Sequence, residues 1–498
     1  MKRQGILLRA LFAAALCACL MIPAAAQTFP DVPETHWAYA NIEEAAADGA
    51  IKGYSNGTFA PNSPLTLAHF TVILVRSFYT DDYNLELSHI SSPYVEWYDA
   101  AETVARDHGL LKGVNANMTE PLSRYGMAME IYNLLQSEGC EFVRNDVLKA
   151  FASIADLYDF PSDAMANAVA CVYSKGILNG YSDGEFHGYL IPNRAQAAAI
   201  YCRLKNLLAS LAYDKLLSDY GTLPNKKPSQ MTVRDVYTPG RTTGSTFTYQ
   251  GSKIPIYAGV ERLQVGPGDF VWRTGGRLRY VGNKYDAWFG VDVSAYQNRD
   301  RTNGTINWKA AKEDGVQFAM IRVGLRGTST GALREDPYYA KNIEGALAQG
   351  IQTGAYIFAQ AINIQEAIEE ADFVIARLRG HKINGPVSYD WEVNSDSYRG
   401  ANVSKEMATA CAVAFCKRVA AAGYTPMFYN SRHEAYFRYD QGALAPYMMW
   451  YPQYPLTSNA NPYPNLYYQM DYWQFTESGK VYGIGNKIDC DIWLKPKR

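Results

Sequence analysis

Short apolar segments alternate with amphipathic stretches over residues 286–498, and this alternation limits the folds open to the chain. Strands are expected at 288–293, 318–323, 354–359, 386–391, 426–429, 447–451 and 471–475. Helices are expected at 308–314, 338–348, 364–378 and 404–422. Strands that alternate with helices form a parallel sheet joined by helical crossovers. The fold class predicted here is α/β, most simply a TIM-like β/α barrel, with an incomplete or flattened barrel left open.

Acidic residues stand where expected strands end. Asp292 ends the first strand, Asp390 and Glu392 end the strand at 386–391, and Asp489 follows Ile488. In β/α barrels the catalytic groups project from the C-terminal ends of the strands. Asp390 and Glu392 share one face of their strand and lie about 6.6 Å apart at the usual rise per residue. A lone Asp-x-Glu is typical of a solvated strand end, but the accompanying Asp292 and Asp489 make the pattern more specific.

Two carboxyl groups on one face repel each other, so one of them retains its proton near neutral pH. A protonated acid beside a charged partner is what cleavage of a glycosidic bond requires. The expected separation lies between the usual retaining and inverting ranges, so it leaves the stereochemistry open, substrate assistance included. No metal is required, because neither a His pair nor a Cys cluster stands near the acids. The acid spacing typical of chitinases is absent, since residues 385–392 contain only the final Asp-x-Glu.

Ordered motifs over residues 288–494 resemble the glycoside hydrolase family 25 muramidases, the Chalaropsis-type lysozymes. They are Gly290-Val291-Asp292-Val293-Ser294 with Gln297, Ile306-Asn307-Trp308, Ile321-Arg322, Asp336-Pro337 with Asn342, Gly354-Ala355-Tyr356-Ile357-Phe358, Asp390-Trp391-Glu392, Tyr429-Asn430, Trp450, Trp473-Gln474-Phe475 and Asp489. The chain departs from the family pattern at Asp491, where an uncharged residue is usual, and in the strand at 448–451.

The resemblance implies hydrolysis of the β-1,4 bond between N-acetylmuramic acid and N-acetylglucosamine in peptidoglycan. Glu392 would donate the proton, and Asp390 would raise its pKa and steady the developing positive charge. Asp292 and Asp489 would shape an acidic floor and hydrogen-bond the substrate. The candidate substrate-binding residues are Tyr356, Tyr429, Trp450, Trp473, Gln297 and Arg322. For each single aromatic residue, core packing is an equally open interpretation.

An internal repeat occupies the N-terminal half of the chain. Residues 52–59 and 179–186 share a Gly-Tyr-Ser-x-Gly-x-Phe pattern, and a weaker copy spans residues 97–113. After each glycine turn a second helix begins, with Thr66, Ser123 and Asn193 as candidate N-caps. Each copy is thus helix, glycine loop and helix, a unit that needs its neighbours to bury its apolar face.

These repeats resemble the S-layer homology repeats of bacterial surface proteins, in an all-α domain at 28–207 with copies at about 28–80, 90–138 and 148–207. Phe29-Pro30-Asp31-Val32 with His36-Trp37-Ala38 is similar to that family's opening. The resemblance implies non-covalent attachment to a cell-wall polysaccharide, often an acidic one. The family's Thr-Arg-Ala-Glu-like ligand motif is degraded here, and Arg124 and Arg194 are the remaining candidates for binding wall polymer. A helical spacer that no longer binds the wall is the alternative.

Residues 1–26 are predicted to form a secretory signal peptide. Lys2, Arg3 and Arg9 precede or flank an apolar core, and three alanines form a small-residue cleavage site before Gln27. We expect an exported protein of the bacterial cell surface or cell wall, with no integral membrane segment after cleavage. The near balance of 47 Lys+Arg against 49 Asp+Glu argues against a nucleic-acid binder.

Residues 208–285 read as a linker or a small β module, and they are assigned no chemistry.

Six cysteines follow the predicted signal peptide: Cys140, Cys171, Cys202, Cys411, Cys416 and Cys490. Buried thiols and extracellular pairing both remain open for them.

Two classes of function follow from these patterns. The first is a secreted, wall-anchored muramidase that uses no cofactor. The second is a catalytically silent surface protein that binds peptidoglycan through its barrel.

Overall fold

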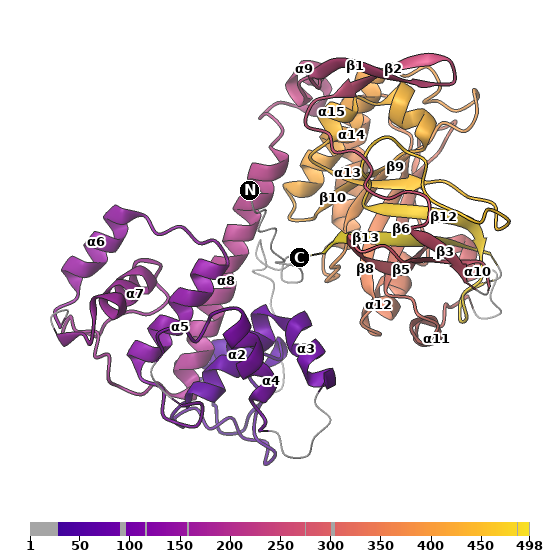
Figure 1. Ribbon diagram of the computed structural model, residues 1–498. Coiled ribbons are helices and arrows are strands. Elements are labelled where there is room, and N and C mark those ends of the chain that lie inside the picture. Colours follow the sequence, from indigo (N-terminus) through magenta and orange to yellow (C-terminus); the bar gives the residue numbers. More distant parts are fainter. Residues whose placement is uncertain are drawn as a thin grey trace. The chain divides into compact units, whose positions relative to one another are not determined.

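The computed structural model describes residues 28–89, 96–114, 117–156, 159–273, 275–299, 304–485 and 487–497. The predicted signal peptide lies outside these residues. The chain divides after Ala212 into two compact units, which we describe separately (Figure 1). In the described part of the chain, no helix is both long enough and apolar enough to cross a bilayer.

The first unit is helical. Its helices are α1 (Tyr39–Ala47), α2 (Leu67–Phe78), α3 (Thr80–His89), α4 (Asp99–Asp107), α5 (Arg124–Ser137), α6 (Arg144–Ser153), α7 (Asp163–Ser174) and α8 (Arg194–Tyr220), the last of which continues into the second unit. The pairs α1–α2, α4–α5 and α7–α8 each enclose a glycine loop, as the repeat predicts. One apolar core is built from all three pairs.

The N-caps expected from the sequence are confirmed. Thr66 Oγ1 accepts from the His69 N–H at 3.3 Å and Ser123 Oγ accepts from the Gly126 N–H at 3.2 Å. Asn193 Oδ1 accepts from the Gln196 N–H at 2.9 Å. The segments that lead into these helices also bond to one another, through short bridges that pair Pro64 with Asn193 and Thr66 with Pro121. The three copies therefore meet where their second helices begin.

The second unit is built around a sheet that closes on itself. Its strands are β5 (Tyr285–Val293), β6 (Phe318–Arg326), β8 (Gln352–Ala359), β9 (Val387–Trp391), β10 (Pro426–Tyr429), β11 (Met448–Pro452), β12 (Tyr472–Gly479) and β13 (Ile488–Pro496). Each pairs with its neighbour in the order β5-β13-β12-β11-β10-β9-β8-β6, and β6 pairs back to β5. The short β7 (Leu333–Glu335) adds to β6 outside this ring.

This arrangement confirms a barrel-like α/β sheet but differs from a TIM barrel. Seven of the eight strands run parallel, whereas β13 runs antiparallel to both of its neighbours, β12 and β5 (Figure 1). Sequence analysis did not predict β13 as a strand. A sheet closed by one reversed strand needs no crossover helix on either side of that strand.

Helices cover the outside of the barrel. They are α11 (Trp308–Glu313), α12 (Tyr339–Leu347), α13 (Ile364–Leu378), α14 (Lys405–Ala420), the π-helical turn η3 (Glu434–Arg438) and α15 (Gln441–Leu444). The core between strands and helices is distinct from a smaller core inside the barrel, which consists of Phe318, Met320, Tyr356, Met427, Tyr429, Trp450, Tyr472 and Trp493. The side chains of each strand thus alternate between an outer and an inner apolar layer.

Residues 213–285 pack onto this barrel. They form η2 (Pro228–Gln230), α9 (Val233–Val236) and two hairpins, β1 (Thr242–Tyr249) with β2 (Ser252–Tyr257) and β3 (Phe270–Arg273) with β4 (Arg277–Tyr280). Ile254, Phe270 and Leu278 are buried in the outer core, and Phe247 stacks on Tyr467 with ring centroids 4.3 Å apart. The segment therefore covers part of the barrel instead of hanging free. A short helix, α10 (Ala295–Arg299), follows β5.

The six cysteines of the described residues are all buried free thiols. Burial raises the pKa of the Cys171 thiol to about 11, which keeps it protonated and unreactive at neutral pH.

Candidate functional site

The predicted acids meet at one end of the barrel. Asp390 lies near the C-terminal end of the parallel strand β9, and Asp292 lies near that of β5. Asp489 begins the reversed strand β13 and pairs directly with Asp292 in register. Glu392 follows β9 by one residue. The structure thus brings all four carboxyl groups to the same mouth of the barrel.

Asp292 is held by neutral donors. Gln474 Nε2 donates to Asp292 Oδ2 at 2.8 Å, and the Tyr356 hydroxyl donates to Oδ1 at 3.4 Å. Gln474 itself accepts from the hydroxyls of Tyr429 at 3.1 Å and Tyr454 at 2.7 Å. These bonds fix the direction of the Asp292 carboxylate without supplying a positive charge to neutralise it.

Aromatic rings form a floor beneath the acids. The Trp450 ring packs edge-on against Tyr356 and Tyr429, with centroids 5.6 Å and 4.9 Å apart. All three rings are buried in the inner core. Trp450 Nε1 donates to Asp491 Oδ1 at 2.8 Å. The three predicted substrate-binding aromatics therefore lie with the acids, as the floor of the site.

Burial dominates the electrostatics of the mouth. It raises the pKa of Asp292 well above its usual range, and the neighbouring Asp491 raises it further. Burial and then the proximity of Asp292 raise the pKa of Asp489 to about 9. Because these carboxyl groups cannot all ionise together at so small a separation, the mouth retains protons at neutral pH.

Glu392 and Asp390 act as one coupled acid pair. Burial raises the pKa of both groups, and the adjacent Glu392 carboxylate raises that of Asp390 further. The hydrogen bond with Asp390 lowers the pKa of Glu392, opposite to the sequence prediction, so burial is what raises it. Asp390 is buried, whereas Glu392 is only partly buried and faces the mouth. Asn394 Nδ2 donates to Glu392 Oε2 at 2.5 Å. The pair thus holds a proton at neutral pH, and Glu392 is the member within reach of a bound molecule.

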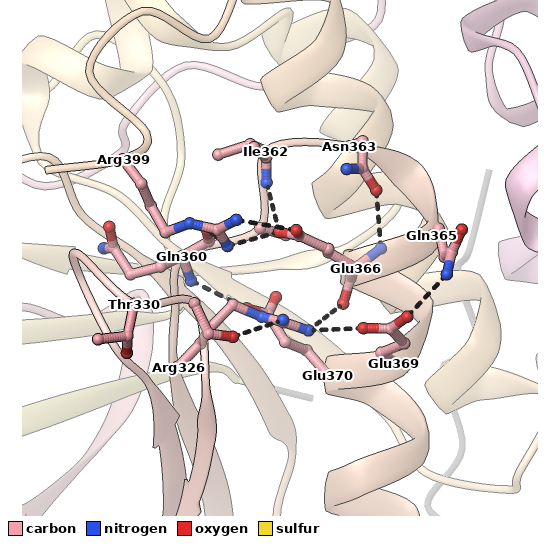
Figure 2. Close-up of polar contacts among 12 residues, drawn as sticks. Arg326, Thr330, Gln360, Ile362, Asn363, Gln365, Glu366, Glu369, Glu370 and Arg399 are labelled. Atoms are coloured by element: carbon pink, nitrogen blue, oxygen red, sulfur yellow. Dashed lines mark hydrogen bonds and ion pairs between the residues drawn. The ribbon is translucent and has the colours of Figure 1, made fainter.

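A buried polar cluster holds the backbone of Glu392. Gln360, just after β8, donates from Nε2 to the Glu392 carbonyl oxygen at 2.7 Å. The Gln360 N–H donates to Glu370 Oε1 at 2.9 Å, and that oxygen also accepts from Arg326 Nε at 2.8 Å (Figure 2). Arg399, from the loop after β9, donates to the Gln360 carbonyl oxygen at 3.2 Å.

The same cluster ties the loop after β9 to helix α13. Arg399 forms a two-pronged pair with Glu366, at 2.6 and 2.9 Å (Figure 2). The Trp391 indole N–H donates to the Ala361 carbonyl oxygen at 3.0 Å. Forked arginine–carboxylate pairs are directional. The residues on either side of Glu392 are therefore fixed to the end of β8 and to α13.

Two predicted site residues, Trp473 and Gln297, lie away from the acids. Trp473 is fully buried on the outward face of β12, where its ring packs against Phe270 and its indole N–H donates to the Gln453 carbonyl oxygen at 2.9 Å. Gln297 Oε1 accepts from the Ser294 N–H at 2.8 Å, so it closes the turn after β5. The structure does not bring these two side chains together with the acids.

Arg322 occupies an intermediate position. It is largely buried and pairs with Asp336 through Nη2 at 3.0 Å. Its positive charge also lowers the pKa of Asp390, against the larger effect of burial. Arg322 therefore acts on the acid pair through its charge.

Sequence analysis did not assign roles to Gln474, Tyr454, Gln360 or Asp491. Gln474 was present in the Trp473-Gln474-Phe475 motif, and strand alternation places it opposite to Trp473. Tyr454 lies at the mouth and is 43% exposed, which suits contact with a bound sugar better than the buried rings do. Only the register of the barrel strands brings these residues to the acids, and no local pattern encodes that register.

The two predicted wall-binding arginines lie in equivalent positions of the first unit. Arg194 donates to the Phe59 and Lys52 carbonyl oxygens at 2.7 and 2.9 Å, and its guanidinium group lies 4.7 Å from the ring of Tyr54. Arg194 itself is buried. It thus joins the second helix of the third copy to the glycine loop of the first.

Arg124 repeats this contact between the second and third copies. It donates to the Phe186 and Asn179 carbonyl oxygens at 2.9 and 2.6 Å, with its guanidinium group 4.9 Å from the ring of Tyr181. Both arginines thus support a glycine loop, beside partly exposed Tyr54 and Tyr181.

One group of possible metal ligands occurs in the described residues. Asp156, Glu185 and His187 of the third repeat present ligand atoms within 4.8 Å of one another. Asp156 accepts from the Phe186 and His187 N–H groups at 2.7 and 2.9 Å, as Asp31 does from Phe59 and Ala60 in the first repeat. The hydrogen bonds that Asp156 accepts from this loop explain why the three side chains lie close together.

Carboxyl groups gathered over aromatic rings at the mouth of a barrel suit the chemistry of a glycoside hydrolase. The family model "Glycosyl hydrolases family 25" matches residues 291–484, and the model "S-layer homology domain" matches residues 28–71 and 157–198. The chain therefore carries a domain of glycosyl hydrolases family 25, preceded by S-layer homology domains.

Similar proteins match parts of the chain. Lysozyme M1 of Streptomyces globisporus is 31% identical over 135 residues, which are 27% of this chain and 38% of that protein. Exoglucanase XynX of Acetivibrio thermocellus is 29% identical over 180 residues, 35% of this chain and 16% of that protein. The alignments span less than a quarter of the length of the first three curated relatives.

Among solved structures, a family 25 glycosyl hydrolase from Bacillus anthracis aligns with 42% of this chain and 89% of its own. The sequence identity is 21% and the TM-score 0.34.

Proposed function

We propose that the protein is a cell-wall-attached lysozyme that hydrolyses the β-1,4 bond between N-acetylmuramic acid and N-acetylglucosamine in peptidoglycan. The observation that carries this proposal is the convergence of Asp390 and Glu392, at the end of β9, with Asp292 and Asp489 at one mouth of the barrel. The family 25 match and the similarity to lysozyme M1 support the choice of substrate.

Glu392 is the proton donor in this proposal. Its pKa is raised by burial, so it is protonated at a pH where an ordinary carboxyl group is ionised. Protonation of the glycosidic oxygen lets the leaving sugar depart as an alcohol, while positive charge develops on the other sugar ring. In their ionised form Asp390 and Asp292 would stabilise this charge. Water then adds to the charged sugar ring, and the proton that it loses returns to Glu392, which completes the hydrolysis.

The decisive test is the release of new reducing ends from purified peptidoglycan. We expect the unmutated protein to release muramic-acid reducing ends, and Glu392→Gln to lower kcat by at least 1,000-fold because the proton donor is lost. Glu313→Gln changes an exposed acid outside the mouth and serves as the matched control, with activity within twofold. Absence of any release by the unmutated protein from several wall types would favour the silent wall-binding protein.

We further propose that the S-layer homology domains hold the enzyme on the cell wall through a polysaccharide. The repeats retain the paired helices and the arginine–tyrosine contacts at Arg194–Tyr54 and Arg124–Tyr181. Co-sedimentation of the Glu392→Gln protein with walls tests this without wall degradation. Binding that disappears when the accessory polysaccharide is stripped from the walls supports the proposal, and unchanged binding to bare peptidoglycan contradicts it.

A further inference from the structure

A cavity of about 710 Å³ opens in the second unit at the other end of the barrel. Tyr285 and Asp286 begin β5 there, Gln317 precedes β6, and Lys497 follows β13. Asp286 lies six residues before Asp292 on the same strand. At the usual rise of a strand, Asp286 lies about 20 Å from Asp292, and Phe289, the β5 lining residue nearest to the mouth, lies about 10 Å from it. A glycan held at the mouth therefore leaves this cavity accessible.

The β3–β4 hairpin brings three arginines to the cavity. Arg277 is engaged, because it donates to the Asp314 backbone oxygen at 2.6 Å, pairs with the Asp314 carboxylate and lies 4.9 Å from the Phe289 ring. Arg273 and Arg279 are exposed, and Arg273 stands opposite Arg277 across the hairpin. Like charges opposite each other destabilise a hairpin. Repulsion between the two facing arginines therefore lowers the stability of this hairpin.

The cavity lining is strongly cationic. Arg273, Arg277, Arg279 and Lys497 face a single lining carboxylate, that of Asp286. Aromatic rings complete the wall at Tyr280, Tyr285, Trp288 and Phe289. A guanidinium fork matches the oxygens of a phosphate, and several forks around one cavity suit a group that carries more than one charged oxygen.

We propose that this cavity binds phosphate groups of a linear polyanion, such as a phosphate-bearing polymer of the cell wall. The carboxyl groups of the mouth offer no attraction to such a polymer, whereas the exposed arginines of the cavity attract it. A polymer held at one end keeps the other end free for a glycan strand. The inference depends on the lining and charge of the cavity, and it goes beyond the proposed hydrolysis.

The test is isothermal titration of the full chain with linear polyphosphate, and with poly-glutamate of the same charge, at about 50 and 300 mM salt. The double variant Arg273→Gln/Arg279→Gln removes the two exposed arginines and leaves Arg277 on Asp314. Arg241→Gln/Arg379→Gln is the matched control, because both arginines are exposed and lie outside the cavity lining. Thermal unfolding checks that all variants are folded.

We expect polyphosphate to bind the unmutated protein and the control alike, more weakly at high salt, and the double variant to lose at least tenfold in affinity. Equal affinity of the double variant, or tighter binding of poly-glutamate than of polyphosphate, would overturn the inference. Release of reducing ends should be unchanged in the double variant. Arginine-dependent binding by a protein that hydrolyses no glycan supports the inference and contradicts the proposed function.

Discussion

The two ends of the barrel differ in the ionisable groups that they present, acids at the mouth and basic side chains at the other end. At the mouth, Asp292 and Asp489 are enclosed, and burial raises their pKa values. At the other end, Arg273, Arg279 and Lys497 are exposed to water. Burial turns the acids into proton donors, whereas exposure keeps the cations permanently charged and free to bind. One scaffold thus provides chemistry at one end and charge at the other.

The sharpest way to test this difference uses two glutamines at opposite ends of β8, Gln352 as its first residue and Gln360 directly after its last. Gln360 holds the Glu392 carbonyl oxygen at the mouth, and Gln352 holds the Asn384 carbonyl oxygen at the other end, through Nε2 at 2.7 and 2.8 Å. We expect Gln360→Met to lower kcat by about 10–100-fold with little change in KM, because small displacements of a catalytic group are costly. Gln352→Met should keep kcat within twofold.

Both glutamine variants lose one hydrogen bond, so we expect both to lose about 1–2 kcal/mol of unfolding free energy. If only Gln360→Met changes kcat and the pH profile, Gln360 is a positioning residue for Glu392. Equal activity of the two variants at equal stability would show that the mouth does not depend on this bond.

The acids of the mouth should also lower stability as the pH rises. The folded-state pKa of Asp489 is about 9, against 3.8 for an ordinary Asp, so the folded state binds this proton more tightly. Its contribution is therefore fully present below about pH 4 and is lost as the pH rises toward 9. We expect Asp489→Asn to be more stable than the unmutated protein by about 1–3 kcal/mol at pH 8, and equal to it at pH 4.

Chemical denaturation at pH 4, 6 and 8 measures this difference. Glu313→Gln, an exposed acid outside the mouth, should change stability by less than about 0.5 kcal/mol at each pH. If the effect of Asp489→Asn on stability does not change with pH, the raised pKa assigned to Asp489 in the folded protein is wrong.

The smallest expected effect concerns Asp491, the buried acid that departs from the family pattern. Its Oδ1 accepts from Trp450, and its hydrogen bond with Asp292 raises the pKa of Asp292. Asparagine can preserve the Trp450 bond and donate toward Asp292 in place of a protonated carboxyl group. We expect Asp491→Asn to keep kcat within threefold, whereas Asp491→Leu should lower it at least tenfold. If both substitutions change kcat equally, Asp491 contributes through packing and not through its hydrogen bonds.

The helices and parallel strands of the barrel could be predicted because their apolar periodicity is strong. Helix α13 has the predicted bounds, with Asn363 accepting from the Glu366 N–H at its N-cap. Strand β13 could not be predicted, because its acids Asp489 and Asp491 face the barrel interior and interrupt the apolar pattern of a buried strand. The reversal of β13 also has no signal in a single sequence.

The acids of the site could be predicted because they follow recognisable strands. Their neutral partners could not. Gln474 and Trp473 are adjacent in sequence, yet alternation sends one to the acids and the other to the outer core. Which of the two side chains faces the mouth depends on the register of β12 in the barrel. That register is set by packing across many strands.

The reversed strand also governs when the site comes into existence. Asp489 pairs with Asp292 across about 200 residues of intervening chain, so the ring of strands closes by a contact with a large loop-closure cost. During synthesis every other strand of the barrel emerges before this one. The acid cluster is therefore assembled last, and a chain still being synthesised carries no complete mouth with which to cut a glycan.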